Sequence, residues 1–130
     1  MNVILDTCAF IWCVSDPDSL TPNAQAAVQA PDAHVFVSVI SCAEVACLAD
    51  AGKIAVTPHW RTWFDGAVAD NGWSVLDIDL LTVQEAFSLP GDFHRDPADR
   101  FITAAARLNR MHVITADQKI LDYPHVQSIW

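Results

Sequence analysis

The chain begins with a short, unbroken run of β-favouring apolar residues, Val3-Ile4-Leu5, and the acid Asp6 follows directly. An unbroken apolar run is typical of a strand buried on both faces, as in parallel sheets. A carboxylate placed directly after such a strand lies at the carboxyl edge of an open α/β sheet, where these folds bind ligands. The first six residues therefore predict a buried parallel strand with a candidate site residue at its end.

Strand-like and helix-like segments alternate along the rest of the chain. Strands are expected over Val35–Val39, Trp73–Ile78 and His112–Thr115, with Val126–Trp130 as a candidate edge strand. The helices expected between them cover 7–14, 21–30, 41–49, a segment that starts at Thr57-Pro58, 82–88, 97–110 and 118–121. This order predicts an α/β fold with a mainly parallel central sheet of about five strands and helices on both faces.

Local patterns mark two of the helix starts. Ser41 and Glu44 have the spacing of a capping box, and Thr57-Pro58 has that of an N-cap followed by proline. The helix after Thr57-Pro58 carries aromatic residues at helical spacing between Trp60 and Ala67. This stripe predicts a helix face in the core or at a dimer contact, and a base-stacking platform is the alternative interpretation.

Composition limits the class of protein. The chain has 130 residues, of which 52% are hydrophobic and 18% charged, so we expect one ordered domain over residues 1–130. The formal net charge is -9, with only seven basic residues. Such a chain cannot coat nucleic acid with basic side chains, so a nucleic-acid ligand would require bound cations or a partner subunit.

The four cysteines, Cys8, Cys13, Cys42 and Cys47, lie in apolar stretches without zinc-finger spacing. We therefore expect buried free thiols in a reducing compartment. The N-terminus lacks a basic segment before its apolar run, and no uncharged stretch is long and apolar enough for a bilayer. The protein is expected to be cytoplasmic, with no contact to a membrane.

Context separates four acids, Asp6, Glu44, Asp99 and Asp117, from the sixteen present. Two of them follow strands and two lie in the first turns of helices, so all four are expected at one edge of the sheet. Three of them also have a structural alternative, namely a capping box for Glu44, the helix dipole for Asp99 and an N-cap for Asp117. Asp96, which precedes a proline, is explained well by an N-cap role.

Four carboxylates that converge would raise one another's pKa, a cost that hard divalent cations remove. Oxygen ligands without histidine or cysteine favour Mg²⁺ or Mn²⁺ over zinc. The chemistry that uses such a cluster is phosphoryl transfer in which cations activate water and stabilise the leaving oxygen. The spacing of the residues alone therefore predicts a metal-dependent enzyme acting on phosphate esters.

Four motifs, Leu5-Asp6-Thr7, Ser38–Ala46, His94–Arg100 and Val113–Asp117, together resemble those of PIN domains, specifically the VapC toxin ribonucleases of bacterial type II toxin–antitoxin pairs. The resemblance covers essentially the whole chain. It implies a PIN-like three-layer fold and cleavage of RNA that depends on Mg²⁺ or Mn²⁺. The four acids named above are then the metal-binding and catalytic residues.

Residues near these motifs have secondary roles. The family register prefers Asp99 to Asp96 as the third acid, and Asp96 remains an assisting candidate. Thr115 is a candidate to hold a water or a neighbouring carboxylate through its hydroxyl. Arg100 is expected to pair with one of the acids, with contact to RNA phosphate as the alternative. His94 is a candidate general acid, although the cations can do that work without it.

The resemblance also implies partners, namely a second copy in a homodimer, an RNA substrate and a cognate antitoxin whose tail enters the site. Two departures from the family pattern, Cys8 and Cys42-Ala43, leave substrate preference and packing beneath the site open. Two other functions are alternatives to this interpretation. A phosphatase of the haloacid dehalogenase type needs a second acid where Cys8 stands, and a PIN-like scaffold for a protein partner would not need all four acids.

Overall fold

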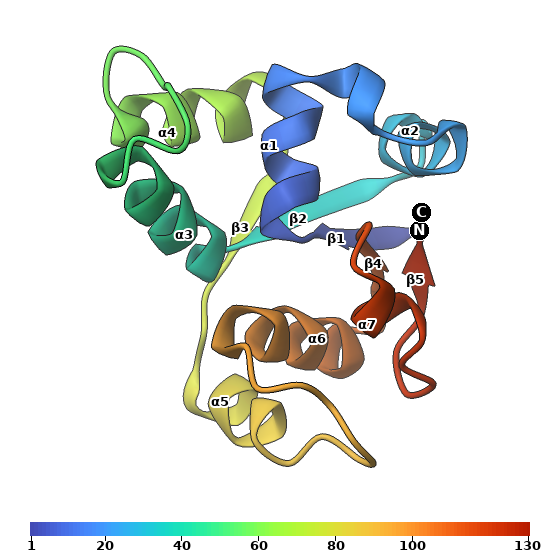
Figure 1. Cartoon of the computed structure of the whole chain (residues 1–130). Coiled ribbons are helices and arrows are strands. Elements are labelled where there is room, and N and C mark those ends of the chain that lie inside the picture. Colours follow the sequence, from blue (N-terminus) through green and yellow to red (C-terminus); the bar gives the residue numbers. More distant parts are fainter.

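The computed structural model describes residues 1–130, and its five strands form one all-parallel sheet in the order β3-β2-β1-β4-β5 (Figure 1). The strands are β1 Asn2–Leu5, β2 His34–Ser38, β3 Ser74–Leu76, β4 His112–Ile114 and β5 Ser128–Ile129. The predicted α/β fold with a parallel central sheet is confirmed.

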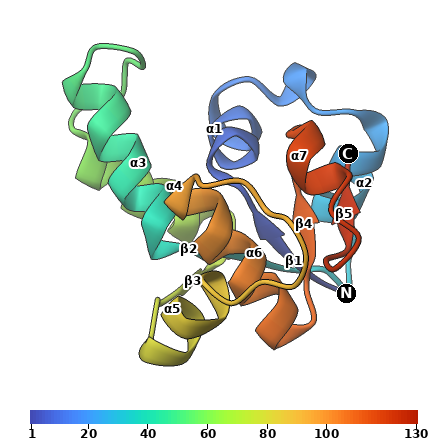
Figure 2. The same ribbon diagram turned by 60° about the horizontal axis from the view of Figure 1, so that its bottom comes forward.

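Seven α-helices and one short 3-10 helix connect the strands, in the predicted order of elements. They are α1 Thr7–Ser15, the 3-10 helix η1 Pro17–Ser19, α2 Pro22–Gln29, α3 Val39–Asp50, α4 Trp60–Asp70, α5 Leu80–Ala86, α6 Pro97–Asn109 and α7 Gln118–Leu121. In Figure 1, α1, α2 and α4 cover one face of the sheet, and α5 and α6 cover the other. Figure 2 shows α3 reaching from the first layer toward α6, which it contacts.

The central strand β1 supplies both halves of the core. Val3 and Leu5 pack with Phe10 in the cluster under α1, α2, α3 and α4. Ile4 points to the opposite face and packs with Ile102 in the cluster under α6 and α7. All three β1 residues are fully buried, and each such side chain contributes roughly 1.5–3 kcal/mol of hydrophobic stabilisation. The three-layer arrangement therefore follows from the alternation of side chains along one buried strand.

The topology places a crevice at the carboxyl end of β1. From β1 the chain runs first to β2 and β3 on one side, and later to β4 and β5 on the other. Leu5 and Ile114 pair in register at the ends of β1 and β4, and the Asp6 amide donates to the Ile114 carbonyl at 3.1 Å. Ligands in open α/β sheets bind at such a reversal of strand order.

Two predicted helix starts are wrong. Helix α3 begins at Val39 because Ser38, in an extended conformation, is the N-cap and accepts from the Ile40 amide. Ser41 therefore lies inside the helix, and the capping box with Glu44 does not form. Helix α4 begins at Trp60 with His59 as its N-cap, two residues after the N-cap predicted at Thr57.

The third strand and the helix after it also differ from prediction at their ends. Strand β3 ends at Leu76 rather than Ile78, and α5 begins at Leu80 rather than Thr82. The cause is Asp79, whose carboxylate caps α5 by accepting from the Thr82 amide at 2.8 Å. The chain must leave the strand earlier to place this cap.

The aromatic stripe of α4 belongs to the core, because Phe64 and Ala67 are buried and the tryptophans pack against the same cluster. The cysteines are free, as expected, but the prediction that all are buried is wrong. Cys8 and Cys47 are exposed because their helices line a cavity rather than a packed interface. No helix combines the length and apolar character needed to cross a bilayer.

Candidate metal-binding site

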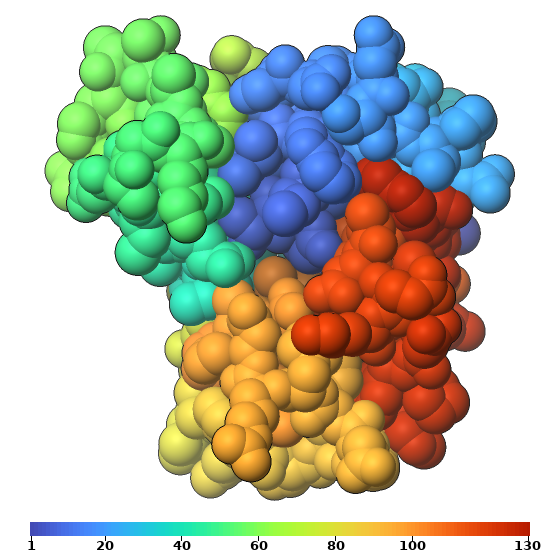
Figure 3. All heavy atoms as spheres, viewed as in Figure 1, coloured from blue at the N-terminus to red at the C-terminus, as the bar shows by residue number.

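The four predicted acids, Asp6, Glu44, Asp99 and Asp117, line one cavity of about 810 Å³ at the carboxyl edge of the sheet. Asp96 lines it too. Figure 3 shows the hollow where α1 (blue), α3 (teal), α6 (orange) and the red segment around α7 meet. The rest of the lining is largely apolar, with Trp12, Ile40 and Leu48 among its side chains. Acids that are far apart in the sequence therefore share one sheltered space.

Asp6 is the most deeply buried of these acids, at 6% exposed. It is the N-cap of α1, and its Oδ1 accepts from the Ala9 amide at 2.8 Å. Burial raises the pKa of Asp6 to about 6, although hydrogen bonds from Thr115 and Ala9 oppose the rise; the nearby charges of Asp99 and Asp117 add to it. The hydrogen bonds thus hold the carboxylate in place, but they only partly compensate the cost of burying its negative charge at neutral pH.

Thr115 connects two of the acids. Its buried hydroxyl donates to Oδ2 of Asp6 and accepts from the Asp117 amide at 3.0 Å. Of the two roles expected for Thr115, the structure shows the contact with a neighbouring carboxylate. Asp117 also caps α7, where its Oδ1 accepts from the Lys119 amide at 2.9 Å. The N-cap role considered for Asp117 is therefore real, and it also fixes the carboxylate at the cavity wall.

Glu44 is fixed by hydroxyl groups from α1 and α3. Thr7 Oγ1 donates to Glu44 Oε1, and Thr7 and Ser41 share a second hydrogen bond at 3.0 Å. Because a hydroxyl has only one proton, Ser41 is the donor in that second bond. Burial raises the pKa of Glu44, the Thr7 hydrogen bond opposes the rise, and the charges of Asp96 and Asp99 add to it.

Asp96 and Asp99 have different positions, as expected. Asp96 is the exposed N-cap of α6 and accepts from the Asp99 amide at 3.1 Å. Asp99 lies in the first turn, with its Oδ2 2.6 Å from Nε2 of His94. Burial raises the pKa of Asp99, the His94 hydrogen bond lowers it, and Asp96 adds to the rise. Asp99 therefore points toward the other acids, while Asp96 mainly starts the helix.

The predicted pairing of Arg100 with an acid is wrong. Its guanidinium donates to three backbone carbonyls, those of His94, Phe93 and Ala86, at 2.8–3.0 Å. A planar guanidinium can serve several carbonyls at once, so it closes the loop between α5 and α6. These guanidinium N–H groups are used inside the protein, so they cannot also bind an RNA phosphate.

The model of the PIN domain family matches residues 3–126. The chain belongs to the PIN domain family. Ribonuclease VapC22 of Mycobacterium tuberculosis (strain ATCC 25618 / H37Rv) is 28% identical over 128 residues, 98% of this chain and 96% of that protein. The resemblance drawn from the sequence is thus confirmed.

Solved structures share the fold of this PIN domain. VapBC2 from Rickettsia felis, bound to a DNA fragment from its promoter, matches with a TM-score of 0.73 at 16% identity over 98% of this chain and 97% of that one. VapBC-5 from Mycobacterium tuberculosis matches with a TM-score of 0.61 at 20% identity over 98% and 96%. At these identities the likeness establishes the architecture.

The donor set of this PIN domain fits a divalent cation. Five carboxylates line the cavity, the four predicted acids and Asp96, and no lysine or arginine forms an ion pair with any of them. Carboxylates brought together without counter-charge are costly, and oxygen ligands suit hard divalent cations. One atom each of His94, Asp99 and Asp117 already lies within 4.8 Å of the others. The sequence placed His94 beside the site as a candidate general acid, and its position among the possible ligands depends on the loop that carries it.

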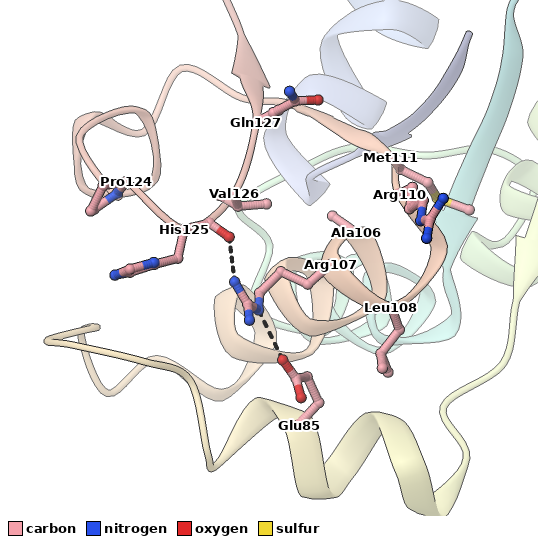
Figure 4. Close-up of a pocket in the computed structure, with 10 residues that line it drawn as sticks. All are labelled: Glu85, Ala106, Arg107, Leu108, Arg110, Met111, Pro124, His125, Val126 and Gln127. Carbon is pink, nitrogen blue, oxygen red and sulfur yellow. Dashed lines mark hydrogen bonds and ion pairs between the residues drawn. The ribbon is translucent and has the colours of Figure 1, made fainter.

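A second cavity of about 620 Å³ lies between α6 and the C-terminal segment (Figure 4). Its chemistry is different. Arg107 donates to Glu85 at 2.8 Å and to the backbone carbonyl of His125, which ties α5, α6 and the segment before β5 together. Arg107 and Glu85 neutralise each other, and Arg110 adds a second basic group without an ion pair. This cavity therefore has a structural ion pair and lacks a converging set of metal ligands.

Proposed function

We propose that residues 1–130 are a single PIN domain that cleaves RNA as a divalent-metal-dependent endoribonuclease, the toxin of a type II toxin–antitoxin pair. The observation that carries this proposal is the convergence of Asp6, Glu44, Asp99 and Asp117 on one cavity at the carboxyl edge of the sheet. The similarity to a relative named as a ribonuclease supports the choice of RNA as substrate.

In this proposal the four acids hold Mg²⁺ or Mn²⁺ and form the catalytic centre. The bound cation supplies Lewis-acid assistance to phosphodiester hydrolysis. The chain itself orients the ligands: Thr115 and the Ala9 amide fix Asp6, and Thr7 fixes Glu44. Hydrogen bonds that metal ligands accept from neighbouring groups set both the direction and the basicity of those ligands.

The apolar part of the cavity supports the proposal that a protein partner binds here. Trp12, Ile40 and Leu48 line it beside the acids, and the similar structures include a toxin–antitoxin complex from Klebsiella pneumoniae. We propose that a cognate antitoxin covers this wall and offers a basic side chain to the carboxylates. A homodimer is part of the same proposal, because a chain with a formal net charge of -9 needs cations or a second subunit to retain RNA.

The test is cleavage of total cellular RNA by purified, antitoxin-free protein with Mg²⁺ or Mn²⁺ and with EDTA. Discrete fragments are expected with the cations, and none with EDTA or in the Asp6→Asn and Asp99→Asn variants. Asp96→Asn is the matched control, since asparagine caps a helix as well as aspartate does, and it should retain most of the activity.

Two results would contradict the proposal. If Asp96→Asn abolished cleavage while Asp99→Asn did not, the site would be assigned to the wrong acid of α6. If folded protein cleaved no RNA and bound no Mn²⁺ in a way that depended on Asp6, the chain would be a scaffold for a protein partner rather than an enzyme.

A further inference from the structure

His94 stands outside the four acids that define the proposed centre, yet its ring reaches them. Nε2 lies 2.6 Å from Oδ2 of Asp99, and both side chains are sheltered, at 17% and 21% exposed. The same nitrogen and one oxygen each of Asp99 and Asp117 fall within 4.8 Å of one another. Donors bound to one ion at about 2.1 Å are up to roughly 4.2 Å apart, so these three are close to the spacing that an ion imposes.

The imidazole is held in this position by its surroundings. Arg100 binds the carbonyls of both Phe93 and His94, at 2.8 and 2.9 Å, which fixes the backbone that carries the ring. The Phe93 ring stacks on the imidazole with centroids 4.4 Å apart and planes at 28°. Three chain segments thus bring their donors together: the loop before α6, the first turn of α6 and the turn after β4. Ligands fixed in advance by packing and outer hydrogen bonds are typical of metal sites.

We propose that His94 is a metal ligand through Nε2, together with Asp99 and Asp117, and that this nitrogen shifts the site's selectivity from Mg²⁺ toward Mn²⁺. Imidazole suits transition metals, whereas Mg²⁺ prefers oxygen ligands, so replacing the nitrogen should weaken Mn²⁺ more than Mg²⁺. The inference rests on the proposed function for the presence of a cation, but its test does not depend on RNA cleavage.

The first readout is pulsed electron paramagnetic resonance of the protein loaded with Mn²⁺ alone. A ¹⁴N coupling from a directly bound imidazole is expected in the wild type and in His125→Ala, and it should be absent in His94→Gln. His125 is a matched control because it is an exposed histidine that does not line the acid cavity. Thermal unfolding of each variant in EDTA verifies that the protein is folded.

The second readout is competition between Mn²⁺ and Mg²⁺ in calorimetric titrations. His94→Gln should lower Mn²⁺ affinity by about tenfold or more while changing Mg²⁺ affinity by less than about threefold, in line with the usual effect of losing a site-defining contact. The wild type without nitrogen coupling, coupling that persists in His94→Gln, or an unchanged ratio of the two affinities would each overturn the inference.

These outcomes separate the inference from the proposed function. Suppose that His94→Gln still cleaves RNA with Mg²⁺ and that the wild type shows no nitrogen coupling. The proposed ribonuclease activity would then hold, and His94 would not be a metal ligand. If the wild-type protein shows nitrogen coupling but cuts no RNA, His94 would be a metal ligand and the proposed ribonuclease activity would be wrong.

Discussion

Thr115 donates a hydrogen bond from its buried hydroxyl to Asp6, joining residues 109 positions apart in the chain. The contact exists because β1 and β4 are neighbours and end in register at Leu5 and Ile114. The same hydroxyl accepts from the Asp117 amide at 3.0 Å, which fixes the direction of its proton. One side chain therefore orients an acid from each of the two strands that border the crevice.

Replacing Thr115 by valine removes this hydroxyl and keeps the side-chain shape. We expect the pKa of Asp6 to rise above its value of about 6, because the Thr115 hydrogen bond lowers it. Metal affinity should fall by about 10–100-fold, the usual cost of losing a partner of a metal ligand. Titration with Mn²⁺ measures this, and Thr115→Ser is the control that retains the hydroxyl. Equal affinity in wild type and Thr115→Val would show that the hydroxyl does not orient Asp6.

The buried Asp6 makes the metal-free protein less stable at neutral pH. Its folded pKa of about 6 exceeds the ordinary value of 3.8. Between these values the folded state binds more protons than the unfolded state, so stability falls as pH rises from about 4 to about 6, and the deficit persists above that. A difference of about 2 pKa units corresponds to roughly 3 kcal/mol.

Asp6→Asn should therefore stabilise the protein in EDTA at pH 7, with a gain on the order of 2 kcal/mol and much less at pH 4. Asparagine also keeps the cap acceptor for the Ala9 amide. Urea unfolding at the two pH values measures the effect. Asp79→Asn is the contrasting control, because hydrogen bonds from Thr82 lower the pKa of Asp79 and its carboxylate favours folding. A loss of stability in Asp6→Asn at pH 7 would contradict the argument.

Arg100 should be important for stability, since its guanidinium binds two backbone carbonyls of the loop before α6 and one at the end of α5. Arg100→Met is expected to cost about 2–4 kcal/mol of unfolding free energy, because charged hydrogen bonds are lost and carbonyls are left without partners. The exposed side chain of Arg95, five residues earlier, makes no hydrogen bond or ion pair, and Arg95→Met should change stability by less than about 0.5 kcal/mol. Denaturant unfolding compares the two; equal losses would refute a special role for Arg100.

Features written in local sequence could be predicted. The Val3-Ile4-Leu5 run predicted a buried strand, and Asp96 before a proline predicted the start of α6. Both depend on interactions within a few residues. The convergence of the four acids was also predictable, because parallel strands place their ends at one edge of a sheet whatever the details of packing.

Features decided by distant contacts could not be predicted. Ser38 and Ser41 are both suitable caps, and only the end of β2 selects Ser38, which leaves Ser41 free to bond Thr7. His94 reaches Asp99 because Arg100 closes the loop that carries it. Cysteine is apolar in character, so Cys8 would be expected in the core, yet it is exposed and lines the cavity that also holds the acids.

The Ser41–Thr7–Glu44 series of hydrogen bonds gives the last prediction. Thr7→Val removes the donor to Glu44 and leaves the fully buried Ser41 hydroxyl without its acceptor. The loss of that partner should cost about 1–3 kcal/mol of stability. The Thr7 hydrogen bond lowers a pKa that burial raises, so without it the pKa of Glu44 rises further.

Because protons then compete more strongly with the cation for Glu44, the Mn²⁺ affinity of Thr7→Val should fall relative to wild type, more at pH 6 than at pH 8. Calorimetric titration with Mn²⁺ at both pH values measures this difference. Thr7→Ser is the matched control, since it keeps the hydroxyl and loses only a methyl group, and its pH dependence should follow the wild type. If Thr7→Val bound Mn²⁺ with the wild-type pH dependence, Glu44 would not be a ligand whose protonation limits metal binding.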